Sequence, residues 1–416
     1  MYLNQQRARQ FMREYELDVL VATSPVNITY FSGYFCWLDS TIKGYMVSPG
    51  VSEELVLPGY AVFPMEGQPA LVLNPLFAIN AADLWVQDIR IFGKSNVDSS
   101  FTSEDLPDNY LRFSDMLLSP PQSETALDAL LGILRDRGLL EGRIGLEING
   151  LYPQKISEIK KALPQASLMD CSNLILLVRM VKNDYELEQL TRSAEINEQA
   201  GMEALAQVKP GISLADVSLI YRNRAASFGA DFDHFCIGLN GLGMATEPVY
   251  KFTAEDVMMV DFGCIYNGCY SDTGTTLAIN ENLPRFLNER FKAIRDCISA
   301  GVELICPRVK CSTIYKGMRK ILSEQGFGAS FPRGHGLGLE IRDYPTIGVD
   351  NGLRIHDDCV NVPSDLPLEE KMVINLEVPM FLPGVASFQI EQSWVVTQSG
   401  RRPLVRQKRE QPYTPT

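Results

Sequence analysis

The chain has few of the side chains that structural metal sites and disulfide frameworks use. It contains three histidines among 416 residues, and none of its nine cysteines forms a CxxC pair. The odd cysteine count and the wide spacing argue against a disulfide framework and against a cysteine-rich zinc site. We therefore expect reduced thiols in a cytoplasmic protein.

Positive charge is also scarce. Lys and Arg number 38 against 51 Asp and Glu, which gives a net charge of −13. A nucleic-acid partner is not expected, because binding to phosphates needs a basic surface. The one basic cluster, RRPLVRQKRE at 401–410, is predicted to be a solvated tail. No uninterrupted apolar run is long enough to cross a membrane, and the polar start does not resemble a secretory signal, so no membrane contact is expected.

The length exceeds what one hydrophobic core usually organises, so two domains are expected, 1–175 and 176–416. In the first, apolar runs at 17–23 and 143–150 predict buried strands, and 53–75 predicts two strands around the turn EGQP. Amphipathic segments at 6–16 and 127–137 predict helices. SPVNITYFSGY, at 24–34, is predicted to be a loop and an edge. This is an α/β layout.

The second domain has longer strand patterns. A helix is predicted at 186–208, ended by Pro210 and Gly211, with Ser213 capping the next helix. VMMVDFGCIYNGCYSDTGTTLAI, at 257–279, predicts two strands joined at YNG, a hairpin signal. A long helix at 287–306 and strands at 371–382 and 387–397 follow. The expected architecture is an antiparallel sheet covered by helices.

Acidic residues interrupt these apolar strands. Asp261 ends the run MMV, Asp272 follows the hairpin turn, Glu377 follows VINL and Glu391 follows FQI. His335 lies in the glycine-rich stretch FPRGHGLGLEIRDYP. Carboxylates in apolar strands are costly unless they are paired or bind a cation. The pattern is therefore either a site for two divalent cations or a set of separate structural salt bridges.

The order of these residues, in VDFG, YSDTGTT, GHGLGLE, NLEVP and IEQSWVVT, resembles the pita-bread metallopeptidases. That family includes proline dipeptidases, proline-specific and methionine aminopeptidases, and creatinase. LDVLVATSPVNITYFSGY resembles the start of a creatinase-type N-terminal domain, and VRMVKNDYELEQL resembles the linker into the catalytic domain. The resemblance implies an α/β N-terminal domain, an α+β pita-bread domain with a curved antiparallel sheet, and a homodimer.

The resemblance also implies roles for the five residues. Asp261 would chelate one metal, Asp272 and Glu391 would bridge two, and His335 and Glu377 would complete the ligands. Glu377 would also accept the proton of the attacking water. The glycines around His335 would let the backbone come close to the site. One histidine among oxygen ligands suits Mn²⁺, Fe²⁺, Co²⁺ or Zn²⁺, and the sequence does not select among them.

Three histidines that surround the metals in peptidase members have no counterpart here. The segment 238–248 holds none, Phe331 stands four residues before His335, and Arg342 stands seven after it. An arginine usual after the second Asp is also missing from DTGTT. In peptidases these histidines hold the scissile carbonyl and its developing charge. Arg342 is instead suited to bind a carboxylate.

Weaker candidates remain around this set. His234, in DFDHFCIG, is either a substrate contact or an ordinary half-buried histidine. Tyr344 either lines the pocket or packs. Glu247 is either a substrate-facing acid or part of a surface salt bridge, and His356 is expected in an exposed loop. Cys264 and Cys269 are expected to be structural thiols.

The leading hypothesis is a dinuclear metal hydrolase that cleaves a C–N bond in a small substrate or short peptide. Glu377 would shuttle the proton, and His234, Arg342 and Tyr344 would position the substrate. One alternative is a non-peptidase member of the fold, either a lyase like the dimethylsulfoniopropionate-cleaving branch or a hydrolase of a small zwitterionic metabolite. The other is a non-catalytic metal-binding homologue.

Overall fold

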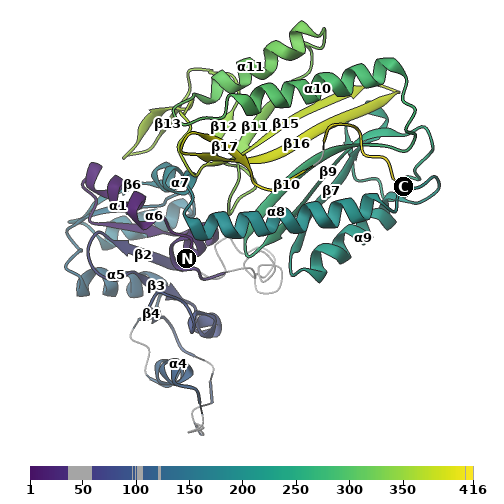
Figure 1. Ribbon diagram of the computed structural model, residues 1–416. Helices are drawn as coiled ribbons and strands as arrows, with labels where there is room; N and C mark the ends of the chain where they lie inside the picture. Colours follow the sequence, from purple (N-terminus) through teal and green to yellow (C-terminus); the bar gives the residue numbers. More distant parts are fainter. Residues whose placement is uncertain are drawn as a thin grey trace. The chain divides into compact units, whose positions relative to one another are not determined.

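The computed structural model describes residues 1–35, 59–95, 97–98, 100, 106–119, 123–407 and 409–415 (Figure 1). These residues form two compact units. The first comprises 1–178 with 355–361, and the second comprises 179–354 with 362–416. None of the helices in the described ranges is both long and apolar enough to cross a membrane.

The first unit is built on a six-stranded mixed sheet in the order β4-β3-β2-β1-β5-β6. Its central strand β1 is buried along its whole length, pairing antiparallel with β2 and parallel with β5. The hairpin predicted around EGQP is confirmed as β2 and β3, although the start of its first apolar run lies outside the described residues. The strands are β1 (Val19–Ala22), β2 (Tyr60–Pro64), β3 (Ala70–Leu73), β4 (Asp88–Ile91), β5 (Arg143–Leu146) and β6 (Ser167–Asp170).

Helices accompany this sheet, as the α/β prediction requires. The prediction for 127–137 is confirmed by α5 (Ala126–Asp136), which begins with a reciprocal capping box between Thr125 and Asp128. The buried side of α5 packs against apolar side chains of β1, β2 and β3. The other helical segments are α1 (Gln5–Glu14), the 3₁₀ helix η1 (Pro75–Ala81), α4 (Asp108–Leu118), α6 (Pro153–Ala162) and α7 (Ser172–Met180).

The prediction of a loop and edge at 24–34 is wrong, because this segment forms helix α2 (Pro25–Ser32). Ser24 caps it by accepting a hydrogen bond from the backbone N–H of Asn27. Proline occupies the first turn, and Gly33 ends the helix with φ 81°. Ser-Pro at the start and glycine after the end are helix-boundary signals that outweigh the strand preference of the Ile, Thr, Tyr and Phe between them.

The second unit is built on a nine-stranded sheet in the order β12-β11-β15-β16-β10-β9-β7-β8, with β17 beside β16. Every strand pair in it is antiparallel. The hairpin predicted at 257–279 is confirmed as β9 and β10. The strands are β7 (Asp231–Gly238), β8 (Met244–Ala245), β9 (Val257–Tyr266), β10 (Cys269–Ala278), β11 (Arg333–Gly336), β12 (Asp343–Ile347), β15 (Val373–Leu382), β16 (Ala386–Thr397) and β17 (Gly400–Pro403). The short strands β13 (Arg354–His356) and β14 (Asn361–Pro363) pair separately.

Helices cover one face of this sheet (Figure 1). A Cβ on Gly201 of α8 would fall 2.1 Å from the Phe262 ring, and one on Gly301 of α10 would fall 3.2 Å from Leu376. Because side chains alternate along a strand, Asp261 and Glu377 must point to the opposite face. The helices of this unit are α8 (Asp184–Leu205), α9 (Leu214–Ser227), α10 (Arg285–Glu303) and α11 (Cys311–Glu324), with the short 3₁₀ turn η2 (Leu239–Gly241).

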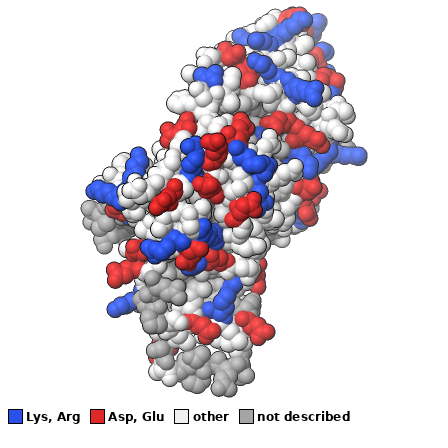
Figure 2. Space-filling view, turned by 90° about the vertical axis from the view of Figure 1, so that its left-hand side faces the viewer, with Lys and Arg blue, Asp and Glu red and all other residues white. Residues whose placement is uncertain are grey.

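Two predictions at the ends of elements have opposite outcomes. Ser213 caps α9, as expected, in a capping box with Asp216. The basic segment 401–410 is not a solvated tail in its described residues. Its first residues form β17, Arg401 pairs with Glu303, and buried Arg409 pairs with Glu198. Elsewhere, on the face drawn in Figure 2, acidic and basic side chains are interspersed.

Candidate metal centre

The register of the second sheet brings the predicted ligands to one face in two adjacent rows. In the first row, Asp261 is opposite Gly274, Gly274 is opposite Glu391, and Glu391 is opposite Glu377. In the second row, Gly263 lies between Asp272 on one side and His234 on the other. At the far edge of the site, His335 lies opposite Asn375 on β15. Residues directly opposite one another on paired strands share a face, so these side chains converge.

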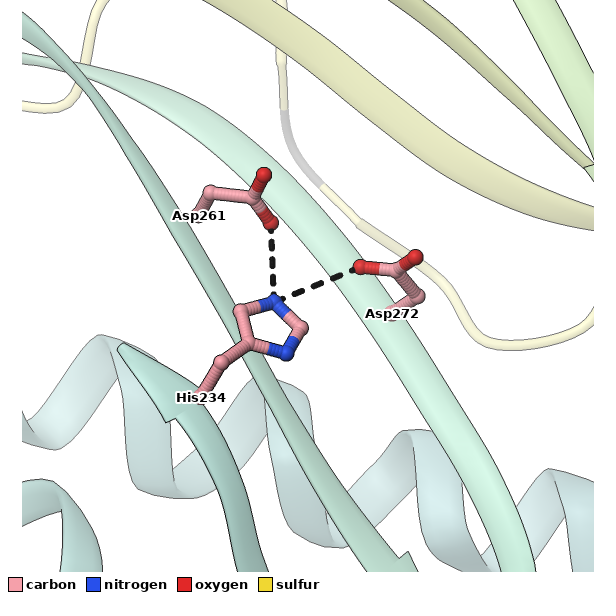
Figure 3. Close-up of side chains that lie close together, drawn as sticks. All are labelled: His234, Asp261 and Asp272. Carbon is pink, nitrogen blue, oxygen red and sulfur yellow. Dashed lines mark hydrogen bonds and ion pairs between the residues drawn. The ribbon is translucent and has the colours of Figure 1, made fainter. Parts of the chain in front are cut away.

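One group of possible ligands consists of His234, Asp261 and Asp272 (Figure 3). The Nε2 atom of His234 lies 3.1 Å from Oδ1 of Asp261 and 3.5 Å from Oδ1 of Asp272. The other ring nitrogen, Nδ1, lies 2.7 Å from the carboxylate of Asp233. The imidazole therefore sits between an outer carboxylate and two inner ones.

A second group consists of Asp272, His335 and Glu391. Nε2 of His335 lies 3.5 Å from Oδ2 of Asp272, and Nδ1 lies 3.0 Å from the carbonyl oxygen of Gly336. Amide groups of Asn375 and Gln389 each donate to one oxygen of Glu391 at 2.8 Å. Asp272 belongs to both groups, with one oxygen directed at each histidine.

Glu377 lies beside these groups, but its carboxylate is hydrogen-bonded to an arginine. The guanidinium of Arg333 donates to both of its oxygens, from Nε at 2.6 Å and from Nη2 at 3.1 Å. Nη2 of Arg342 lies 4.0 Å from the same carboxylate. Glu377 is buried, whereas the side chain of Arg333 is 51% exposed. Glu377 thus lies opposite Glu391, and Arg333 contacts its carboxylate from the solvent side.

The carboxylates in this site repel one another. Burial raises the pKa of Glu391 well above its usual range, and the charges of Asp272, Asp261 and Glu377 raise it further. The pKa of Asp261 is also raised, by burial and by Asp272, against the hydrogen bond from His234. Burial lowers the pKa of His234, but its contacts with Asp233 and Asp261 raise it to about 10. The protein alone leaves an excess of negative charge here.

A divalent metal fits the residues present. His335 is only 2% exposed, yet among the described residues its Nε2 has no hydrogen-bond partner. A buried polar atom without a partner is costly, so this nitrogen is placed for a ligand. Carboxylate oxygens with imidazole nitrogen are donors that suit Zn²⁺ and Mn²⁺.

The glycines beside His335 were expected to let the backbone come close to the site, but the structure shows a different steric requirement for them. A Cβ at Gly334 would fall 2.3 Å from the carbonyl oxygen of Asn375, and one at Gly336 would fall 2.1 Å from that of Tyr344. These two glycines therefore allow β11 to pack between its neighbouring strands. Gly263 is the glycine that opens the site itself, because a Cβ there would lie 2.5 Å from Cε1 of His234.

The positions flanking His335 separate into exposed and buried residues. Phe331 is 64% exposed, with the guanidinium of Arg319 over its ring. The side chain of Arg342 is 63% exposed, whereas its neighbour Asp343 is buried between Arg179 and Lys182, each 2.9 Å away. These cations hold the pKa of Asp343 below its usual range, although burial alone raises it. Asp343 is structural, and Arg342 remains available to a ligand.

The remaining candidates belong to neither of the two groups. Tyr344 is half-buried on β12. Glu247 and His356 are exposed. Cys264 and Cys269 are buried free thiols, and burial raises the pKa of both.

Two functional candidates were missed at the sequence level, Asp233 and Arg333. Arg333 stands two residues before His335, and on a strand this spacing places both on one face. Asp233 adjoins His234, and a carboxylate beside a histidine is a recurrent partner of metal-bound imidazole. Both signals are present in the sequence, but each gains meaning only once the strand boundaries are known.

Comparison with known proteins shows that each of the two units resembles a known family. Residues 188–398, just over half of the chain, match the family model for metallopeptidase family M24. Residues 5–181 match the creatinase/prolidase N-terminal domain. A Xaa-Pro dipeptidase from Lactobacillus delbrueckii subsp. lactis is 25% identical over 417 residues, covering 98% of each chain.

Solved structures agree on the fold. An X-Pro aminopeptidase from Thermotoga maritima superposes with a TM-score of 0.71 at 18% identity, covering 98% of both chains. A prolidase from Pyrococcus furiosus gives 0.66 at 20% identity, covering 96% of this chain and 99% of the other. The fold is the pita-bread fold, with its curved antiparallel sheet, preceded by a creatinase-type domain. The chain therefore belongs to metallopeptidase family M24 and is a metal-dependent hydrolase.

Proposed function

We propose that the protein is a peptidase that hydrolyses the amide bond before proline in short peptides. The observation that carries the proposal is the pair of carboxylate–histidine groups that share Asp272 on the face of the sheet opposite the helices. One relative that matches along 98% of this chain is a Xaa-Pro dipeptidase. The ligands proposed for two divalent ions are Asp261, Asp272, His335, Glu377 and Glu391.

Two bound divalent ions would polarise the scissile carbonyl and lower the pKa of an attacking water. Manganese, cobalt, iron and zinc all suit this donor set, and we propose manganese as the native metal. Asn375 and Gln389 fix the orientation of Glu391 by donating to one oxygen each. His335 is oriented through Nδ1, which lies beside the carbonyl of Gly336.

Glu377 is proposed to accept a proton from the attacking water and pass it to the leaving nitrogen. Arg333 acts as a positioning residue, because its planar guanidinium contacts both carboxylate oxygens. This contact fixes the plane of the carboxylate with respect to Glu391, its cross-strand neighbour.

Arg342 and Tyr344 are proposed to position the substrate. Arg342 is mostly exposed, lies 4.0 Å from Glu377 and carries a charge suited to a peptide carboxylate. Tyr344 lies two positions along the same segment, at the start of β12. In this arrangement arginine would supply a charge at a position where the resemblance to the peptidases implies a histidine.

The test is hydrolysis of Xaa-Pro dipeptides by protein stripped of metal and reloaded separately with Mn²⁺, Co²⁺ or Zn²⁺. The matched controls are the corresponding Xaa-Ala dipeptides. We expect metal-dependent release of proline and at least tenfold slower cleavage of the alanine series. Metal-loaded protein that cleaves no Xaa-Pro dipeptide or tripeptide would remove the peptidase assignment.

Three further features are proposed for the whole protein. We propose domains at 1–175 and 176–416, a cytoplasmic location and a homodimer. The eight described cysteines are all free, which suits a reducing compartment. Light scattering of the purified chain tests the dimer, and a mass near 46.4 kDa would contradict it.

A further inference from the structure

His234 lies where a third protein ligand for one ion would be expected. Its Nε2 faces Oδ1 of both Asp261 and Asp272. We propose that His234 is a metal ligand, forming one ion site with Asp261 and Asp272, and that Asp233 orients it. This differs from the substrate contact predicted from sequence, and it rests on the metal centre of the proposed function.

The orientation of the ring supports ligation. Nδ1 lies 2.7 Å from Oδ2 of Asp233, a carboxylate that only accepts hydrogen bonds when ionised. In neutral imidazole a proton on Nδ1 leaves the Nε2 lone pair free, directed at the inner carboxylates. A carboxylate behind a histidine, with the metal in front, is the usual outer partner of a metal-bound imidazole.

The two histidines are placed equivalently about Asp272. Nε2 of His234 is 3.5 Å from one oxygen of Asp272, and Nε2 of His335 is 3.5 Å from the other. Two donors about 2.1 Å from one tetrahedral ion lie roughly 3.4 Å apart. Each histidine therefore stands at ligand–ligand distance from its own oxygen of the shared carboxylate.

Local packing keeps room for the ring of His234. Gly263 lies between His234 and Asp272 in the same cross-strand row. A Cβ there would lie 2.5 Å from Cε1 and 2.7 Å from Nδ1 of the imidazole. A register shift between Phe232 and His234 on β7 also falls next to this position. The imidazole thus reaches Asp272 across the one position in the row that has no side chain.

His234 would complete the protein ligands of one ion. That ion would be held by His234, Asp261 and one oxygen of Asp272, and the other by Glu391, His335 and Glu377 with the second oxygen of Asp272. Three protein ligands on the first ion leave positions open for water and substrate, as in catalytic zinc sites. Glu377 keeps its place in the proposed ligand set, with Arg333 donating to both of its oxygens.

The test counts the coordinated imidazoles directly. The chain has only three histidines, so ¹⁵N-histidine labelling of the full-length protein gives a spectrum that single variants can assign. Zn²⁺ is added to metal-free protein, and the Nε2 resonances are followed. We expect those of His234 and His335 to move to coordinated values, while that of exposed His356 stays unchanged.

The alternative outcomes separate the two proposals. If only His335 responds to Zn²⁺, the metal centre stands and the ligand role of His234 is overturned. If neither responds and no Zn²⁺ binds, the metal centre of the proposed function fails as well. A His234 resonance that shows protonation of both nitrogens in the Zn²⁺-loaded protein would assign it to an ion pair and would also overturn the inference.

Calorimetric titration with Zn²⁺ provides a second, independent measure. Asp233→Asn keeps the imidazole but removes its orienting carboxylate, and we expect about 10–100-fold weaker binding of one ion. His234→Asn should weaken the same ion at least as much, and His356→Asn is the matched control with unchanged affinity. Unchanged affinity of both ions in His234→Asn would contradict the proposal. Thermal unfolding of the metal-free variants shows whether a loss reflects the site or the fold.

Discussion

Arg333 on β11 lies directly opposite Glu377 on β15 and binds both of its carboxylate oxygens. The buried carboxylate that we propose as the proton acceptor is thus held in one plane by a half-exposed cation. The pair links the rim of the site to its interior, because Glu377 is in turn opposite Glu391.

Arg333→Ala should reduce kcat by about 100-fold with little change in KM, because the carboxylate loses its fixed orientation. Arg333→Lys should recover only part of the activity, since an ammonium cannot make two parallel hydrogen bonds. Steady-state kinetics with a Xaa-Pro dipeptide measures both. Arg342→Ala is the matched control and should act mainly on KM. Equal effects on kcat from both arginines would contradict the positioning role.

Asp272→Asn should abolish the stabilisation of the protein by metal. An ion that binds only the folded state adds about 2.7 kcal/mol at 100 times its Kd. Wild-type protein should therefore melt higher in Mn²⁺ than in chelator, and the variant should melt at one temperature in both. Without metal the variant should be at least as stable as wild type, because one of several clustered negative charges is gone. A normal metal-induced shift in the variant would exclude Asp272 as the shared ligand.

Gly263→Ala should weaken metal binding without touching a ligand. The added methyl group would overlap the ring of His234, and overpacking of this kind typically costs 1–3 kcal/mol of unfolding free energy. Calorimetry should show weaker binding of one ion. Gly348→Ala serves as control, because a Cβ at that position meets no atom within 4 Å. If Gly263→Ala binds both ions normally, metal binding does not require the space that Gly263 leaves for the His234 ring.

Glu186 lies outside the metal centre and makes the stability of the folded state depend on pH. Burial raises its pKa to about 7, against the nearby charge of Lys182. The folded state therefore holds this proton more tightly than the unfolded state does. The unfolding free energy that this tighter proton binding contributes is fully present below the ordinary pKa near 4.5. It is lost as the pH rises to about 7.

Glu186→Gln should consequently unfold at higher denaturant than wild type at pH 8, by up to roughly 3 kcal/mol, with a smaller difference at pH 5. Glutamine can still accept the capping hydrogen bond from the N–H of Asn183. Urea titrations at both values test this. Exposed Glu188→Gln, on the same helix, should show no such pH-dependent difference. A variant less stable than wild type at pH 8 would contradict the assignment.

The strand pattern allowed most of the fold to be predicted, because carboxylates that interrupt apolar runs marked the face of β9, β10, β15 and β16 that the helices do not cover. Register could not be predicted in the same way. That Arg333 faces Glu377 depends on how β11 pairs with β15, which no local signal encodes. The position of His234 depends on a register shift in β7. Helix α2 was missed because its aromatic and β-branched residues suggested a strand, although the sequence contains the signals for both ends of the helix.

The β9–β10 hairpin has a consequence for the order in which the centre assembles. Asp261 and Asp272 lie on strands joined by the tight turn at Asn267 and Gly268, both with positive φ. Such a hairpin needs only local chain closure and forms in about 1–10 µs. Glu391 joins it from far along the chain, and long-range closure is slower. A folding chain would therefore present a two-carboxylate half-site first, and the full ion sites would exist only after β16 has docked.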